Sequence, residues 1–387
     1  MNSLSAFVKI VLLVVPGWVA GATLDYAALP GKKAMAVAPD DATVTGIAHS
    51  QAQDLAASQM ALAQCEQANT RTTGRACELV RLNDEQIRTG RDILDAVPTT
   101  PHPLYLWRYQ SDSATVYLAG SIHMLKSSLY PLAEQLQAAF DSSTHLVLEV
   151  DSTALTTQDM QMKVMKAGLL PSGQTLRGVL AQPLHERLEA RLQSYGIDIA
   201  AVQRMNPAMV MNQLVLLRLM ALGYDAALGM EQHFTALLGD RQILELESVD
   251  QQLEMLFGQP IETQIQLLRD ALDQELDVEP IMADMITAWL SGADQRFLDL
   301  FSEQAGDSEL AKAFNKQLLD DRNQGMAQKV QSYLEATGTY FVLIGAAHFI
   351  GDNGIVAILG RQQIEGTRVM SDWTTQTITD NEDTAWK

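Results

Sequence analysis

The 387-residue chain has few basic residues, few prolines and only two cysteines. Its 27 Lys and Arg stand against 47 Asp and Glu, which gives a formal net charge of −20. A surface of that sign repels phosphate backbones and anionic lipid head groups, so nucleic acid is not an expected partner. With only 12 Pro and 24 Gly and 47% hydrophobic residues, the composition excludes a fibrous or disordered chain and predicts a packed globular protein.

The apolar run near the N-terminus is too short to span a membrane. Lys9 precedes the run 10–15, and the small residues 20–22 follow it. This layout is typical of a secretory signal peptide, whereas a spanning helix needs roughly 20 apolar residues. A retained N-terminal anchor is the alternative. We expect residues 1–22 to be a signal peptide cleaved after Ala22, which predicts a periplasmic or secreted bacterial protein with no stable membrane insertion afterwards.

The two cysteines, Cys65 and Cys77, lie in the exported part and flank a polar, turn-prone segment, 69–75. In an oxidising compartment this spacing favours a disulfide, and the alternative is two buried free thiols. No neighbouring residue would obviously activate a thiolate, so a cysteine nucleophile is not favoured.

The chain divides into two regions that differ in composition and in predicted secondary structure. Residues 23–100 are rich in Ala, Gln and Asp and predict a helical accessory segment, with helices at 54–67 and 77–95. Prolines at 98, 101 and 103 mark a boundary, so residues 101–387 are expected to form the main domain.

The main domain is predicted to be α/β, with a central sheet. The expected elements are strands at 104–109 and 115–119, a helix at 130–140, a strand at 145–150, helices over most of 155–335 including 184–195, 207–222, 230–238, 251–257, 262–272 and 311–336, strands at 242–247 and 339–344, a helix at 354–359 and a strand at 368–370.

Two short segments carry the clearest chemical signal. Apolar strands at 116–119 and 342–344 each lead into Gly-x-x-His, at 120–123 and 345–348. Glycine at a strand end lets the backbone turn and lets a ligand approach closely. The histidine then projects into the crevice where open α/β sheets place their sites. A third copy, at 46–49, lacks the apolar strand, and we attribute it to chance.

Glu149 ends the apolar strand that follows the first motif. Burying a carboxylate costs several kcal/mol unless it is paired or metal-bound; a solvated strand end is the alternative. His123, Glu149 and His348 together suit a divalent metal with an open position for water. Such an ion lowers the pKa of bound water to about 7, which is hydrolase chemistry.

A serine hydrolase is less well supported by the sequence. Ser121 adjoins the first motif, but no Gly-x-Ser-x-Gly elbow occurs there. Ala346 takes the equivalent place in the second motif, so we interpret Ser121 as a requirement for a small residue.

These motifs resemble the TraB/GumN family, to which the TIKI metalloproteases also belong. The resemblance extends over about residues 104–370 and leaves the accessory segment outside. It rests on the two Gly-x-x-His motifs with Glu149, and on four further elements in the same order: Gly229-Met230-Glu231, with Glu where Asp is commoner, Leu246-Glu247-Ser248 followed by Gln252, Asp321-Arg322-Asn323, and the closing Gly345–Gly351 with Gly354.

The resemblance implies a TIKI/ChaN-like core with a large helical insertion between the two Gly-x-x-His halves. It also implies metal-dependent hydrolysis of a peptide or protein substrate. The metal would be a divalent ion such as Mn, Co or Zn. A metal- or haem-binding protein without catalysis is the alternative, because haem-binding proteins of similar fold share the resemblance.

The resemblance also assigns roles to individual residues. His123, Glu149 and His348 become the expected metal ligands or catalytic groups. Arg322 would stabilise negative charge or orient Glu149, unless it only pairs with Asp320 or Asp321 on a helix surface. Asn323 would hold a substrate carbonyl or a ligand. The residues expected to support the ligands are Gly120, Gly345, Glu247 and His233.

Overall fold

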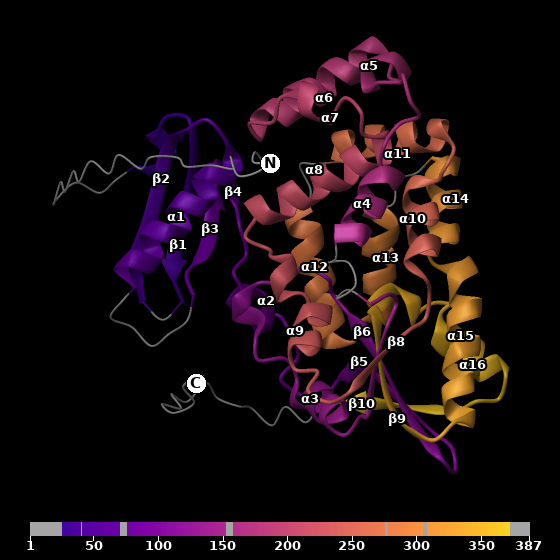
Figure 1. Ribbon diagram of the computed structural model, residues 1–387. Helices are drawn as coiled ribbons and strands as arrows, with labels where there is room; N and C mark the ends of the chain where they lie inside the picture. The colour runs from indigo at the N-terminus through magenta and orange to yellow at the C-terminus, as the bar shows by residue number, and fades with distance from the viewer. Residues whose placement is uncertain are drawn as a thin grey trace.

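The computed structural model describes residues 25–39, 41–69, 76–151, 158–274, 278–304 and 308–371. They form a small accessory domain, indigo in Figure 1, beside a larger main domain that contains the helices and the second sheet. The predicted signal peptide, 1–22, lies outside the described residues. Within those ranges, none of the helices combines the length and the apolar character needed to cross a membrane.

The accessory domain is α/β, so the prediction of a helical segment was wrong. Its elements are β1 Lys32–Ala38, β2 Asp41–Gln51, α1 Asp54–Ala68, β3 Glu78–Leu82, β4 Glu85–Gln86 and α2 Gly90–Asp95, and its antiparallel sheet has the order β2-β1-β3-β4. The helix at 54–67 is confirmed, but 77–95 begins with two strands, and both strands between 32 and 51 were missed.

Alanine explains the error. Ala34, Ala36 and Ala38 alternate along β1, and all three are buried. Alanine is the best helix former, and its small side chain gives a weak period-two signal. Small residues also set the packing of helix on sheet, because a methyl group on Gly46 would lie 2.0 Å from the carbonyl oxygen of Ala61 in α1.

The predicted disulfide is confirmed. Cys65 in the last turn of α1 is bonded to Cys77 just before β3, with an S–S distance of 2.00 Å. The alternative of two free thiols was therefore wrong. The bond joins two elements of the accessory domain and lies outside the main domain.

Replacing Cys65 with Ala is expected to lower the stability of the accessory domain by about 3 kcal/mol, because the chain between the cysteines gains freedom when the domain unfolds. Amide hydrogen exchange in α1 and β3 should accelerate accordingly, and reduction of the wild type should reproduce the effect. Unchanged exchange in both experiments would contradict the stabilising role of the bond.

The main domain contains a six-stranded sheet with the order β10-β5-β6-β9-β7-β8. The strands are β5 Pro103–Gln110, β6 Ala114–Ser121, β7 His145–Leu148, β8 Gln242–Glu245, β9 Gly338–Gly345 and β10 Gly366–Met370, so every predicted strand is confirmed. β6, β9, β7 and β8 run parallel, whereas β5 is antiparallel to both β6 and β10. The parallel strands therefore end at one edge of the sheet.

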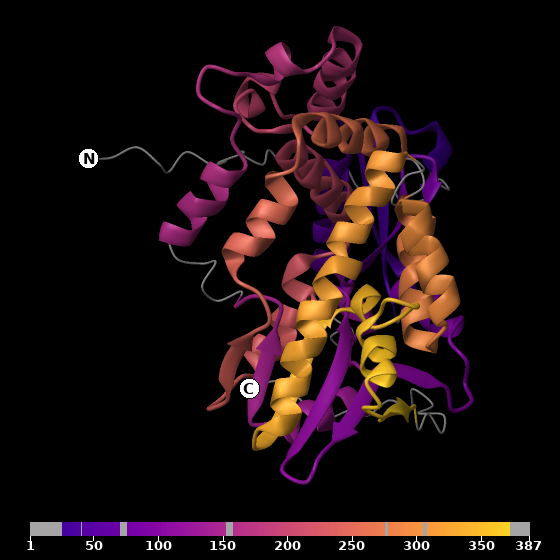
Figure 2. The same ribbon diagram turned by 90° about the vertical axis from the view of Figure 1, so that its right-hand side faces the viewer.

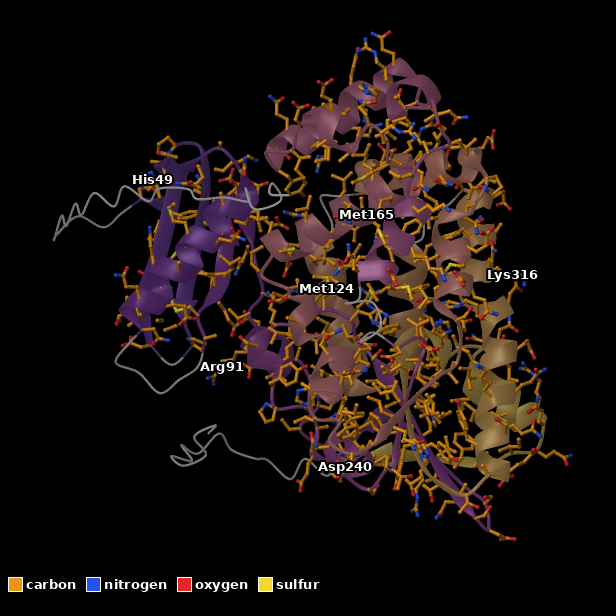
Figure 3. The ribbon with its side chains drawn as sticks, in the orientation of Figure 1. His49, Arg91, Met124, Met165, Asp240 and Lys316 are labelled. Carbon is orange, nitrogen blue, oxygen red and sulfur yellow. A yellow bond between two sulfur atoms is a disulfide. The ribbon has the colours of Figure 1, made fainter. Side chains whose placement is uncertain are left out.

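Helices cover both faces of this sheet, as Figures 1 and 2 show for α3 and α15. Consecutive residues of β9 point to opposite faces: Phe341 packs against Phe140 of α3 and Phe234 of α9, and Tyr340 stacks on Tyr333 of α15. Two helices each connect two strands of the sheet. α3, Glu134–Asp141, lies between β6 and β7 in the sequence, and α16, Ile355–Arg361, lies between β9 and β10. The charged side chains labelled in Figure 3, including Asp240 and Lys316, lie at the periphery.

The described residues between β7 and β9 are mostly helical, as predicted, apart from β8. Its helices are α4 Gln158–Ala167, α5 Leu176–Val179, α6 Gln182–Ser194, α7 Ile199–Val202, α8 Pro207–Ala221, α9 Met230–Ala236, α10 Val249–Phe257, α11 Ile261–Gln274, α12 Val278–Ser291, α13 Asp294–Gln304, α14 Glu309–Leu318 and α15 Asp320–Glu335. The single helix predicted at 311–336 is two helices that meet at Leu319, and Asp320 and Asp321 suit the first turn of the second.

Candidate functional site

Three neighbouring strands bring the predicted site residues together. β9 lies between β6 and β7, with Ser121 of β6 opposite Gly345 and Leu148 of β7 opposite Leu343. His123 follows β6, Glu149 follows β7, and His348 closes the short 3-10 turn η6, Ala346–His348, after β9. The sheet therefore gathers three side chains that are far apart in the sequence at one edge, beside the first turn of α15.

Gly345 occupies the centre of this group. A methyl group at this position would lie 3.4 Å from Nε2 of His123, 3.5 Å from Oε1 of Glu149 and 3.7 Å from Cδ2 of His348. These atoms therefore surround one small space, and the two imidazoles are within about 7 Å of each other. Only a residue without a side chain leaves that space open.

The orientation of His123 is fixed by Glu231, at the start of α9. Nδ1 of the imidazole lies 2.9 Å from Oε1 of Glu231, which also accepts a hydrogen bond from Oγ of Ser121. The carboxylate therefore favours the tautomer that carries its proton on Nδ1 and turns Nε2 toward Gly345. The side chain of His123 is 66% exposed, so this part of the site is open to solvent.

His348 is held in the same way by Asn323. Its Nδ1 lies 2.6 Å from Oδ1 of Asn323, whose amide nitrogen donates to the carbonyl oxygen of Asn353 at 2.9 Å. Nε2 lies 3.7 Å from Oε1 of Glu149 and 3.4 Å from Nη1 of Arg322. Both ends of the Asn323 amide are engaged within the protein, so this buried residue orients His348, and its role toward a substrate carbonyl or a ligand stays a prediction.

Glu149 accepts hydrogen bonds from three directions. Its Oε2 accepts from Nη2 of Arg322 at 2.7 Å and from Nε2 of Gln252 at 2.9 Å, and its Oε1 accepts from the backbone nitrogen of Gly345 at 3.1 Å. The alternative of a solvated strand-end carboxylate is therefore wrong. One side of Oε1 remains directed toward the histidines.

Arg322, in the first turn of α15, joins two carboxylates. Its Nε and Nη2 bind Glu247 at 2.9 Å and 2.6 Å, and Nη2 also binds Glu149. Asp321 pairs instead with Lys316, so the alternative of a surface ion pair for Arg322 is wrong. Arg322 orients Glu149, as the resemblance implied, and Glu247 in turn fixes the guanidinium.

The charges set distinct protonation states. Burial opposes ionisation of Glu149, but His348, Arg322 and His123 favour it and lower its pKa to about 2. Burial lowers the pKa of His348 to about 4, so at neutral pH its imidazole is uncharged. The Glu231 carboxylate raises the pKa of His123 to about 9, so at neutral pH this imidazole is protonated and a metal would have to displace its proton from Nε2.

A pocket of about 600 Å³ adjoins the outer side of the Arg322–Glu247 pair. Its lining combines amide, hydroxyl and charged side chains with a few apolar ones: Leu246, Glu247, Gln251, Met255, Gln317, Asp321, Arg322, Gly325, Met326, Gln328, Lys329 and Ser332. The pocket lies between α10 and α15, so the two helices give access to one flank of the site.

Two other predicted residues support the site differently. The carbonyl oxygen of Gly120 accepts a hydrogen bond from Nε1 of Trp289 at 2.8 Å, and a methyl group there would crowd Tyr105 and Ala346. His233 packs its ring against Tyr130 and stands beside the Glu231 turn, outside the ring of ligating atoms around Gly345.

Sequence reasoning missed Glu231 and Gln252 as site residues and undervalued Ser121. Glu231 and Gln252 belong to the segments that carry the resemblance, but the sequence assigned neither of them a role in the site. The available signal was position: Glu231 stands in the first turn of a helix directly after Gly229, and Gln252 follows the capping residue Ser248. The hydroxyl of Ser121 is used by Glu231, so this residue does more than meet a size limit.

The donor set fits a divalent cation by its chemistry. As the side chains lie here, no group of three or more His, Cys, Asp or Glu side chains in the described ranges is arranged to hold a metal ion. However, Nε2 of His123, Oε1 of Glu149 and the ring of His348 line one space, and both Nδ1 atoms have hydrogen-bond partners. A divalent ion on Nε2 of His123 would take the place of a proton, and it would neutralise the combined charge of −2 that Glu149, Glu231, Glu247 and Arg322 carry.

Comparisons with known proteins agree with the motifs. The chain is 22% identical over 268 residues to a protein of Treponema pallidum (strain Nichols) that is described as an uncharacterized protein, and the match spans 67% of this chain and 80% of that protein. No solved structure matches the chain significantly. The pattern of the TraB/PrgY/gumN family matches residues 105–368, which include every site residue described above. The chain therefore belongs to the TraB/PrgY/gumN family.

Proposed function

We propose that the protein is an exported, metal-dependent hydrolase that acts on peptides or proteins and has a TIKI/ChaN-like core. The observation that carries this proposal is the space beside Gly345, which Nε2 of His123, Oε1 of Glu149 and the ring of His348 surround. The disulfide of the accessory domain supports an oxidising compartment, such as the periplasm.

Each residue then has a specific task. A divalent ion held by His123, Glu149 and His348 would lower the pKa of a bound water and polarise a substrate carbonyl. Glu231 and Asn323 bind Nδ1 of the two imidazoles and leave Nε2 for a metal, although Nη1 of Arg322, 3.4 Å from Nε2 of His348, would have to move aside. Arg322 holds Glu149 in place, and its positive charge would stabilise the negative charge that develops on the oxygen of the reacting carbonyl.

The pocket beside the site suits a peptide. Gln251, Gln317 and Gln328 line it and offer both donors and acceptors for a peptide backbone, and none of its lining residues is a His or Tyr that could serve as an axial ligand of haem. Protein purified from its host should accordingly show no Soret absorption band, and a band of one haem per chain would favour the alternative.

Titration of metal-free protein with Mn²⁺, Co²⁺ and Zn²⁺ in separate calorimetric experiments tests the metal site. We expect one ion to bind per chain and chelation to remove it. The His348→Ala variant should lose this binding, and His185→Ala, at a buried histidine of α6 that is bonded to Gln203, should retain it. Equal binding by both variants would exclude the proposed ligands.

Replacing Gly345 with Ala is expected to weaken metal binding at least tenfold, because the new methyl group fills the space between the three donors. The free energy of unfolding should change by no more than about 1 kcal/mol, since the backbone has negative φ and the new contacts are at ordinary van der Waals distances.

Calorimetric titration and urea unfolding of the two proteins measure these effects. Gly360→Ala is the matched control, because a methyl group at that position meets nothing within 4 Å. Unchanged metal affinity in Gly345→Ala would show that the ion, if any, binds elsewhere.

A further inference from the structure

The loop that carries His123 is fixed on one side by the main domain. The backbone of Met230 donates to the carbonyl of Ile122 at 3.2 Å, and Leu125 exchanges two backbone hydrogen bonds with Asp225, at 3.3 Å and 2.9 Å. A methyl group on Gly229 would lie 2.2 Å from the carbonyl oxygen of His123. The segment before α9 therefore presses directly against this loop.

The other side of the same loop contacts the accessory domain. Lys126, three residues after His123, is 4% exposed, and its ammonium donates a hydrogen bond to the carbonyl oxygen of Arg88. The 3-10 turn η2, Ser127–Leu129, continues the contact, because a methyl group on Gly90 of α2 would lie 2.0 Å from Oγ of Ser128. The two domains thus touch without space for water at this point.

Arg88 also ties the accessory domain to α12. Its backbone nitrogen donates to Glu279 at 2.9 Å, and its guanidinium donates to Asp284 and to the carbonyl of Pro280, both at 2.6 Å. Figure 1 shows α2 beside α12. Further along α12, Trp289 binds the carbonyl of Gly120. Arg88 therefore contacts Lys126, which follows the motif at 120–123, and α12, which binds the carbonyl of Gly120 through Trp289.

Buried charges make this contact specific. Lys126, Glu78 and Glu279 are each no more than 6% exposed, and Lys126 also lies 4.7 Å from the centre of the Tyr224 ring. Glu78 accepts from the backbone of Gly90 at 2.7 Å. Separating the domains would break the hydrogen bonds of Arg88 to Lys126 and to Glu279, and a buried charge without a partner is costly, so these contacts favour the docked arrangement.

We propose that the accessory domain is part of the framework of the site, and that Lys126 is the positioning residue through which it fixes the loop of His123. The proposal assigns a task to residues that lie outside the part of the chain matched by the family, 105–368. It rests on the proposed function only in that His123 belongs to the site.

The test replaces Lys126 with Met in the full chain and follows the imidazole resonances of ¹⁵N-labelled histidine. Those of His123 should shift, whereas those of His348, fixed separately by Asn323, should stay in place. Hydrolysis should fall on the order of tenfold to a hundredfold in kcat, because small displacements of a catalytic group are costly.

Lys33→Met is the matched control. Lys33 is 6% exposed, donates to the carbonyl oxygen of Ala27 at 2.8 Å and lies 5.2 Å from the centre of the Tyr26 ring, but these contacts are within the accessory domain. Its replacement should move neither histidine. Unchanged His123 resonances in folded Lys126→Met, or equal shifts in Lys33→Met, would overturn the proposal.

A second pair of variants keeps the test decisive if Lys126→Met does not fold. Arg88→Ala should shift the same His123 resonances, and Arg91→Ala should not, because Arg91 is 67% exposed and pairs with Asp95, 3.7 Å away in the same helix. Figure 3 labels Arg91 beside this boundary. If the wild type hydrolyses no peptide, the proposed function fails, and the resonances still decide whether Lys126 positions His123.

Discussion

Glu149→Gln is expected to lower metal-dependent peptide hydrolysis by a factor of roughly 10³ or more, because it removes the one anionic ligand while keeping the shape of the side chain. Peptide cleavage with excess metal, measured as kcat/KM, gives the size of the loss. The carbonyl oxygen of Gln can accept from Arg322 and Gln252 in the place of Oε2, but its amide nitrogen cannot accept from Gly345 in the place of Oε1, so urea unfolding must show that the variant is folded.

The loss should not add to that of other ligand variants. A protein that combines Glu149→Gln with His123→Ala or His348→Ala should be about as inactive as each single variant, because the three residues act as one unit. Glu245→Gln is the matched control, since this carboxylate stands at the end of the adjacent strand β8 and binds the backbone of Asp151 instead. Activity of Glu149→Gln within tenfold of the wild type would rule out a catalytic role for the carboxylate.

Arg322→Ala is expected to reduce the free energy of unfolding by about 3–5 kcal/mol, because it leaves two buried carboxylates without their shared cation. The side chains of Arg322, Glu149 and Glu247 are only 12%, 15% and 12% exposed, so water cannot replace the guanidinium fully. Urea unfolding measures the loss, and adding Glu247→Gln to Arg322→Ala should recover part of it.

The same variant should show a defined pH dependence. In the wild type the pKa of Glu149 is about 2, below its ordinary value of 4.5, so its ionised form adds stability that is complete above pH 4.5 and disappears as the pH falls toward 2. The difference in stability between wild type and Arg322→Ala should therefore shrink over that range. Arg187→Ala is the control, because its pair with Asp273 is half exposed and should cost less than about 1 kcal/mol. A loss no larger in Arg322→Ala than in this control would contradict the buried ion pair.

The central part of the site could be predicted because its signal is local. Each histidine follows an apolar strand and a glycine, and parallel strands end at one edge, so the motif itself implies convergence. What brings His123 and His348 together across 225 positions is the place of β9 between β6 and β7. The order of the strands in the sheet could not be predicted, because the hydrophobic pattern shows where strands lie in the sequence but not which strands pair.

The residues that hold the ligands were harder to predict because their role is tertiary. Glu231 lies 108 positions from His123 and meets it only through the packing of α9 on the loop after β6. The accessory sheet was missed for a different reason, because β1 is rich in alanine, which favours helices. The link from Lys126 to Arg88 depends on the docking of two domains, which no local pattern reports.

The most direct test of the proposed function is digestion of a peptide library by purified protein, followed by mass spectrometry, with chelator, after metal is restored, and with Glu149→Gln. We expect cleavage that chelation abolishes and that Mn²⁺, Co²⁺ or Zn²⁺ restores, and none from the variant. Cleavage that persists in chelator and in Glu149→Gln, or no cleavage by metal-loaded wild type, would contradict a metal-dependent peptidase centred on His123, Glu149 and His348.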